Sequence, residues 1–105
     1  MTFRVDVEPR ASAQLDNLDL WWREHRPDDS ATSVLDEFEY VIGVLEEQPE
    51  IGVPYERKGT KNVRWLRLRG TPYKAFYHFE PGSDVVAIVA VWSGMRGHGP
   101  PLQDR

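Results

Sequence analysis

Cysteine is absent from the 105 residues, so the chain can form neither disulfides nor thiolate metal sites. A lack of cysteine is typical of proteins in a reducing compartment, and we expect a cytoplasmic protein. Long hydrophobic runs are also missing. The longest, Val85 to Trp92, is far short of the roughly 18 residues that a membrane helix needs. No long apolar segment follows the N-terminal MTFRVDVEPR, so we expect neither a secretory signal nor a membrane anchor.

Histidine is scarce and scattered, at positions 25, 78 and 98. This spacing does not fit a zinc motif, and we expect neither a metal nor another cofactor. With 40% hydrophobic and 29% charged residues the composition is that of a globular protein. The length suits one hydrophobic core, which predicts a single domain over residues 1–105.

Acidic residues are missing from one stretch of the sequence. Residues 57–74 contain seven basic residues and no acidic one: Arg57, Lys58, Lys61, Arg64, Arg67, Arg69 and Lys74. Residues 1–52 hold thirteen acids and four bases, a charge of −9, whereas residues 53–105 hold four acids and nine bases, a charge of +5. The division indicates an anionic partner for the second half. Alternatively, the basic stretch compensates the acidic helices of the same molecule.

The first half has the pattern of a short strand followed by two helices. Residues 3–7 alternate between apolar and polar, as in a half-buried strand. Pro9 suits the first position of a helix. For the second helix we expect an N-cap at Asp29 or Ser30 and an end before Pro49. The apolar stripes are Ala11, Leu15, Leu18, Trp22 and His25 in the first helix, and Ala31, Val34, Leu35, Phe38, Val41, Ile42 and Leu45 in the second.

The second half reads as a loop followed by three strands joined by tight turns. The loop covers residues 49–62, and the strands cover residues 63–69, 73–80 and 84–92. The order β-α-α-β-β-β predicts an α+β fold with two helices packed on one face of a small, mostly antiparallel sheet. The last strand is apolar on both faces and needs cover on both. Two helices cover one face, so the loop, the tail or another protein must cover the second.

Basic residues near the ends of these strands are candidates for a functional site. Arg96 lies between two glycines that allow the backbone to turn and expose it; an incidental charge on a turn is the alternative. Arg67 and Arg69 are predicted to share a strand face with Trp65, because residues two apart in a strand point the same way. Such a row is either a contact surface or a sheet edge kept soluble by its charge.

The segments WLRLRGTPYKAFYHF (65–79) and VAVWSGMRG (89–97) resemble the RelE/ParE superfamily of bacterial toxins. These proteins are the toxin halves of type II toxin–antitoxin pairs. The resemblance implies the same fold and a cognate antitoxin whose flexible segment wraps the toxin. RelE-like members cut messenger RNA in the ribosome's decoding site, whereas ParE-like members poison DNA gyrase.

The same resemblance implies which residues would act. Arg67, Lys74 and Arg96 fall on the basic positions that RelE-like toxins use for catalysis without a metal. Two departures weaken a nuclease interpretation: Trp65 stands where RelE-like members tend to have a lysine, and Leu102 where some have a tyrosine. Arginine is a poor proton donor at neutral pH. His98 is the one nearby side chain of a type that titrates near neutrality, so it is the candidate for proton transfer. The alternative is that His98 is a solvated loop residue without a role.

We therefore expect a toxin that its antitoxin neutralises and that binds and poisons DNA gyrase. The net charge of −4 argues against tight docking on ribosomal RNA. The alternatives are a ribosome-dependent, metal-independent endoribonuclease that cuts messenger RNA, and a non-toxic relic that only binds its antitoxin. None of the three involves a membrane or a small-molecule cofactor.

Overall fold

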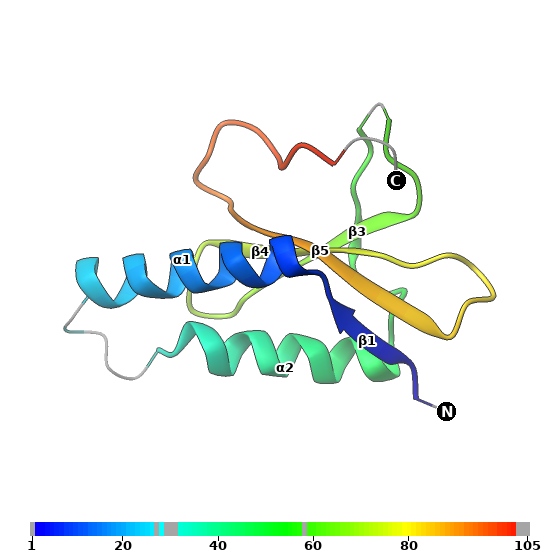
Figure 1. The fold of residues 1–105 in the computed structure, drawn as a ribbon, viewed down its shortest axis with the longest axis horizontal. Helices are drawn as coiled ribbons and strands as arrows, with labels where there is room; N and C mark the ends of the chain where they lie inside the picture. Colours follow the sequence, from blue (N-terminus) through cyan, green and yellow to red (C-terminus); the bar gives the residue numbers. More distant parts are fainter. Residues whose placement is uncertain (1, 27, 29–31, 58, 103–105) are drawn as a thin grey trace.

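The structure, a computed structural model, describes residues 2–26, 28, 32–57 and 59–102. Figure 1 shows two helices side by side, with the strands crossing beyond them. The elements are β1 (Arg4–Val7), α1 (Pro9–His25), α2 (Val34–Glu47), β2 (Val53–Pro54), β3 (Val63–Arg67), β4 (Tyr73–His78) and β5 (Val85–Ser93). This is the predicted α+β fold, with the short β2 added inside the segment that was expected to be a loop. In the described part of the chain, no helix has the length and apolarity needed to cross a membrane.

The five strands form one mixed sheet in the order β1-β5-β4-β3-β2. β1 runs parallel to β5, and the other neighbouring pairs are antiparallel. The turn between β3 and β4 places Arg67 opposite Lys74, and Lys74 lies opposite Trp92 on β5. Directly opposite residues point to the same face of a sheet. Arg67, Lys74 and Trp92 therefore form a row across three strands.

The main core lies between the helices and one face of the sheet. The predicted stripes supply most of its helical residues: Ala11, Leu15, Trp22, Val34, Phe38, Val41 and Leu45 are all buried. They pack against Tyr77, Val86 and Ile88 of the sheet. Leu35 is 38% exposed and His25 is exposed, so their assignment to the stripes was wrong. Ala31 lies outside the described residues.

The opposite face of the sheet has a smaller core of its own. Val63, Phe76, Val89 and Ala90 pack there against Leu102 of the C-terminal tail. Tyr55, in the loop after β2, packs against the same cluster. The loop and the tail thus provide the cover that the apolar strand requires. The sheet offers no bare apolar face in the described residues, so the expected partner needs support from elsewhere.

Large apolar side chains remain exposed outside the two cores. They lie on the helices, around β2 and in the loop after β5: Leu20, Trp21, Leu35, Tyr40, Ile51, Val53 and Met95. α2 also begins later than expected. The Oγ of Ser33 accepts a hydrogen bond of 3.2 Å from the backbone N–H of Asp36 and caps the helix. The predicted caps, Asp29 and Ser30, lie outside the described residues.

β5 extends past the end of β1, and α1 closes this edge of the sheet. The Glu8 N–H donates to the Ile88 carbonyl where β1 ends. Further along, the N–H of Val91 donates to Oε1 of Gln14 over 2.9 Å. A helix side chain therefore satisfies a backbone donor that a neighbouring strand would otherwise pair.

Candidate functional site

A cavity of about 190 Å³ opens on the helix-free face, between β3, β4, β5 and the loop after β5. Lys74 and Arg96 line it together with His98. Aromatic side chains provide much of the wall: Tyr55, Trp65, Phe76 and Trp92. No acidic side chain is among the described residues that line it. The cavity therefore presents positive charge against an aromatic wall.

Lys74 and Arg96 each lie over an indole ring. The Nζ of Lys74 is 4.0 Å from the centre of the Trp65 ring. The guanidinium carbon of Arg96 is 4.2 Å from the centre of the Trp92 ring. The negative face of an aromatic ring attracts a cation, by about 0.5–1 kcal/mol at exposed sites. The rings restrain the two side chains and leave N–H groups free to bind an anion.

The loop that presents Arg96 is fixed at both ends. The N–H of Gly94 donates to the Pro72 carbonyl over 2.6 Å. A Cβ at position 94 would lie 2.8 Å from the same carbonyl oxygen, so this approach requires glycine. At the other end, the indole N–H of Trp92 donates to the His98 carbonyl over 2.9 Å. Arg96 itself is exposed, as expected from the flanking glycines.

Arg67 lies beside the cavity but does not line it. It is exposed on the same sheet face, opposite Lys74, and its Nε donates a long hydrogen bond of 3.4 Å to the Thr71 carbonyl. Arg69 does not share this face, which corrects the prediction. It follows the end of β3, stacks 3.9 Å from the Tyr40 ring centre on α2 and donates to the Tyr40 hydroxyl over 2.7 Å. The structure thus brings Lys74 and Arg96 together and places Arg67 next to them.

The histidines differ in their surroundings. His98 lines the cavity, with its ring centre 5.8 Å from that of Trp92. His78 is half-buried in β4, with Nε2 3.9 Å from a carboxylate oxygen of Glu80. His25 stacks on Trp21, outside the cavity. Among the described residues, no three His, Asp or Glu side chains gather closely enough to hold a metal ion.

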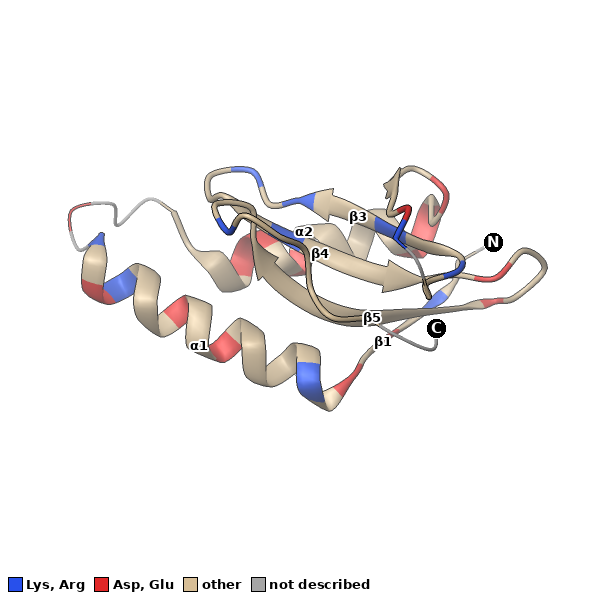
Figure 2. Ribbon diagram, turned by 90° about the horizontal axis from the view of Figure 1, so that it is seen from above, with Lys and Arg blue, Asp and Glu red and all other residues tan. Residues whose placement is uncertain are grey.

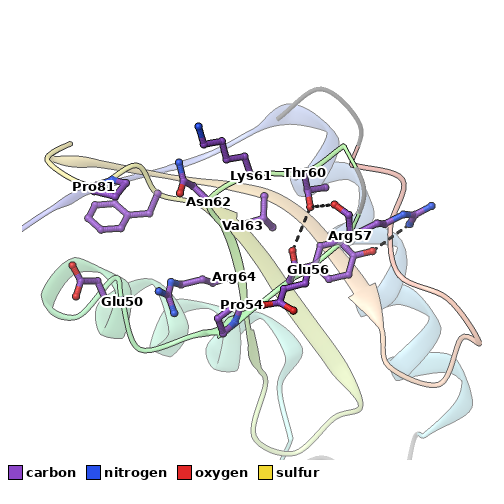
Figure 3. Close-up of a pocket in the computed structure, with 12 residues that line it drawn as sticks. Glu50, Pro54, Glu56, Arg57, Thr60, Lys61, Asn62, Val63, Arg64 and Pro81 are labelled. Atoms are coloured by element: carbon purple, nitrogen blue, oxygen red, sulfur yellow. Dashed lines mark hydrogen bonds between the residues drawn. The ribbon is translucent and has the colours of Figure 1, made fainter.

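A larger cavity, of about 530 Å³, lies beyond the loop that follows β2 (Figure 3). Acidic Glu50 and Glu56 line it together with Arg57, Lys61 and Arg64. Two of these bases bind backbone: Arg64 donates to the Gly52 carbonyl over 2.8 Å, and Arg57 to the Pro100 carbonyl over 2.9 Å. Figure 3 shows these two arginines extending in opposite directions. Mixed charge and occupied donors make this cavity the weaker candidate for an anion site.

Residues 5–97 match the family described as the ParE toxin of the parDE type II toxin–antitoxin system. The chain belongs to this family. The match confirms the predicted membership of the RelE/ParE superfamily. It includes Arg67, Lys74 and Arg96, and it ends before the tail. Among curated proteins, none matches this ParE-family chain in sequence.

Solved structures share the fold of this ParE-family protein. The chromosomal ParDE system of P. aeruginosa has a TM-score of 0.68 at 18% identity, covering 87% of this chain and 95% of that chain. The RelBE2 toxin–antitoxin complex of Mycobacterium tuberculosis has a TM-score of 0.62 at 22% identity, covering 89% and 99%. The intact RelBE complex of E. coli has a TM-score of 0.56 at 21% identity, covering 90% and 99%. At these identities the likeness supports the fold.

Charge in this ParE-family protein is unevenly distributed. Figure 2 shows acidic positions recurring along both helices, and basic ones on β3, on several loops and near the ends of α1. α2 has acidic residues in its first turn and no basic residue in its last. The candidate cavity opens on the face away from these helices. The acidic helices therefore lie on the far side of the sheet from Lys74 and Arg96.

Sequence reasoning missed the residues that hold the cations in place. Trp65 appeared as a departure from the RelE-like pattern, whereas it is the ring under Lys74. The strand register could have revealed this contact. The turn between β3 and β4 pairs Arg67 with Lys74, which makes Trp65 the diagonal neighbour of Lys74. Arg57 appeared only as one of seven bases. Its hydrogen bonds to the tail connect positions separated by 42 and 43 residues in the sequence, and no periodic pattern predicts them.

Proposed function

We propose that this protein is the toxin of a cytoplasmic type II toxin–antitoxin pair, neutralised by a cognate antitoxin, and that the free toxin binds and poisons DNA gyrase. The family match over residues 5–97 is the observation that supports this most directly. It spans both helices and the Arg96 loop. ParE-like members of the superfamily act on gyrase, and the proposal extends that activity to this chain.

The geometry of the cavity suits binding better than proton transfer. Arginine stays protonated in proteins, so Arg96 offers charge and hydrogen-bond donors. The Nζ of Lys74 lies over the Trp65 ring, where it can offer hydrogen-bond donors to an anion. Met95, beside Arg96, is 80% exposed. Exposed apolar surface next to a restrained cation is typical of a protein contact.

An antitoxin partner has separate support. The similar solved structures include toxin–antitoxin complexes. Leu20 and Trp21 on α1 and Tyr40 on α2 are about half exposed and offer apolar surface on the helices. An antitoxin that covered these helices would bury apolar surface without displacing the loop or the tail from the sheet.

A second candidate, the metal-independent endoribonuclease, is favoured by one observation. His98 lines the same cavity as Lys74 and Arg96. An imidazole can move a proton while the two cations stabilise a phosphorane-like transition state. This function requires His98, whereas gyrase poisoning does not. The His98→Ala variant therefore separates the two.

The test is expression in bacteria with and without the antitoxin gene, followed by measurements on the arrested cells. We expect growth arrest only without the antitoxin, with accumulation of double-strand breaks at gyrase sites and intact messengers. Purified toxin should then trap gyrase–DNA cleavage complexes. Messenger cleavage that His98→Ala abolishes, with gyrase unaffected, would replace this proposal by the nuclease. Normal growth without the antitoxin would indicate the non-toxic relic.

A further inference from the structure

The C-terminal tail lies outside the family match and is nevertheless built into the sheet. The match ends at Gly97, yet Pro100 and Leu102 are buried. Leu102 is 4% exposed and packs in the smaller core with Val63 and Phe76. Figure 1 shows the tail, orange to red, turning back toward the green loop before β3. The segment after Gly97 is therefore a structural part of this chain that the family pattern does not specify.

Arg57 makes two of the side-chain hydrogen bonds that hold the tail in this position. Its Nη1 donates to the Gly99 carbonyl at 3.2 Å and to the Pro100 carbonyl at 2.9 Å. The same nitrogen lies 3.2 Å from the Tyr55 hydroxyl, which donates to the Pro100 carbonyl over 3.3 Å. Hydrogen bonds from a charged donor are stronger than neutral ones. Arg57 and Tyr55 together clamp two consecutive carbonyl groups of the tail.

The clamp sits next to the group that closes the Arg96 loop. His98 precedes Gly99, and its carbonyl accepts the Trp92 indole N–H. Residues 93–98 are thus held between Trp92 at one end and the clamped carbonyls at the other. Arg96 lies within this segment, over the ring of the same Trp92. Without the clamp, the end of the loop that carries His98 loses one of its anchors and depends more on the Trp92 hydrogen bond.

Glycine at position 99 makes this close approach possible. A Cβ on Gly99 would overlap the hydroxyl of Tyr55. The φ angle of Gly99 is not positive, so contact rather than backbone conformation demands glycine here. Gly99→Ala is therefore a second way to displace the tail, and it leaves the guanidinium of Arg57 intact.

We propose that Arg57 is a positioning residue: by clamping the tail it fixes the loop that carries Arg96 and His98 over Trp92, and so shapes the candidate cavity. Arg57 does not line this cavity; it acts through the tail. The consequence for toxicity rests on the proposed function, but the structural consequence does not. The two are therefore tested separately.

The structural test is the indole N–H signal of Trp92 in nitrogen-15 NMR spectra of the whole chain, assigned with Trp92→Phe. In Arg57→Ala we expect this signal to shift upfield and to exchange faster with water, because its hydrogen bond to His98 is weakened. Gly99→Ala should do the same, and Arg57→Lys should restore part of the shift. The buried indole N–H of Trp22 should not move and serves as the internal reference. An unchanged Trp92 signal in both Arg57→Ala and Gly99→Ala would overturn the proposal.

The functional test is a double-mutant cycle on target affinity or on growth arrest. Arg57→Ala should weaken target binding about tenfold, because ordering the unclamped loop on binding then costs about as much as the lost charged hydrogen bond contributed, and should have no further effect in an Arg96→Ala background. Equal losses in both backgrounds would show that Arg57 does not act through Arg96. Lys61→Ala removes one exposed charge from the same loop and is the matched control. If the wild-type chain neither arrests growth nor binds gyrase, the proposed function fails, while the NMR result still decides the role of Arg57.

Discussion

The guanidinium carbon of Arg96 lies 4.2 Å from the centre of the Trp92 ring, at the end of the strand from which its own loop departs. Lys74 has the same relation to Trp65. An arginine on a glycine-rich loop would ordinarily sample many conformations. Here the ring restrains it before any target arrives, and a restrained side chain loses less entropy on binding.

Replacing Arg96 by alanine should reduce toxicity and leave the fold intact. The side chain is exposed, and its contact with Trp92 is worth about 0.5–1 kcal/mol, so the free energy of unfolding should fall by less than about 1 kcal/mol. Growth curves and urea unfolding measure the two effects. Arg10→Ala, an exposed charge on α1, is the control. Undiminished growth arrest would remove Arg96 from the functional site.

Lys74→Met tests whether charge inside the cavity matters more than charge in general. Methionine keeps an apolar stem over Trp65 and removes the ammonium group. We expect weaker target binding with a stability change within about 1 kcal/mol, and partial recovery in Lys74→Arg. Lys61→Met is the comparison, since Lys61 is exposed in the other cavity. Equal losses in the two methionine variants would mean that the site is a diffuse basic surface.

Tyr77→Phe should destabilise the protein at neutral pH. The Tyr77 hydroxyl donates to the Pro49 carbonyl over 2.8 Å and accepts the Gly52 N–H over 2.9 Å, and the side chain is fully buried. Phenylalanine leaves both backbone groups without this partner, at a cost of about 1–3 kcal/mol. Urea unfolding at about pH 7 measures the loss, and an unchanged midpoint would contradict it.

The same residue predicts how stability changes at alkaline pH. Burial raises the pKa of Tyr77 above its ordinary value of 10.0, against smaller opposing effects of the Gly52 hydrogen bond and the charge of Arg64. The folded state therefore holds the phenol proton more tightly than the unfolded state. The contribution of the protonated Tyr77 phenol to the free energy of unfolding is complete below the unfolded pKa of about 10. It is lost as the pH rises toward the higher folded pKa. Burial also raises the pKa of Tyr73, so Tyr77→Phe should flatten part of this decline but not all of it.

Gly43→Ala should stabilise the protein. Gly43 lies in α2, and a Cβ placed there has no atom within 4 Å other than those of its chain neighbours and the backbone of its own helix. Alanine in a helix is favoured over glycine by about 0.8–1 kcal/mol. The matched comparison is Gly52→Ala, where a Cβ would lie 2.9 Å from the Trp65 carbonyl oxygen and against the Tyr77 ring. Thermal unfolding should therefore move in opposite directions for the two variants, and a loss of stability in Gly43→Ala would contradict the first expectation.

Periodic patterns predicted the layers of this fold and its helical core. Trp22, Phe38 and Leu45 are buried where the helical spacing placed them. The start of α2 was missed because several residues before it are chemically suited to cap a helix, and the choice of Ser33 depends on how the helix docks. β2 was missed because two residues pair with β3 without a pattern of their own.

The candidate site was also predicted only in part, because local patterns indicate some of its residues and tertiary contacts determine the others. Residue type and flanking glycines pointed to Arg96, and strand alternation placed Arg67 on the face that it occupies. Alternation failed for Arg69 because β3 ends two residues earlier and the chain turns toward α2. The clamp between Arg57 and the tail depends on tertiary contact across more than forty positions, which local sequence does not encode.

The hydrogen bond from Val91 to Gln14 limits how copies of this protein can stick together. A strand edge with free N–H groups recruits strands from other molecules. On this stretch of β5 a glutamine amide already takes the place of such a strand, and the helix behind it blocks access. This stretch of β5 is therefore closed to edge-to-edge pairing with another molecule, and β2 is left as the outer strand at the opposite side of the sheet.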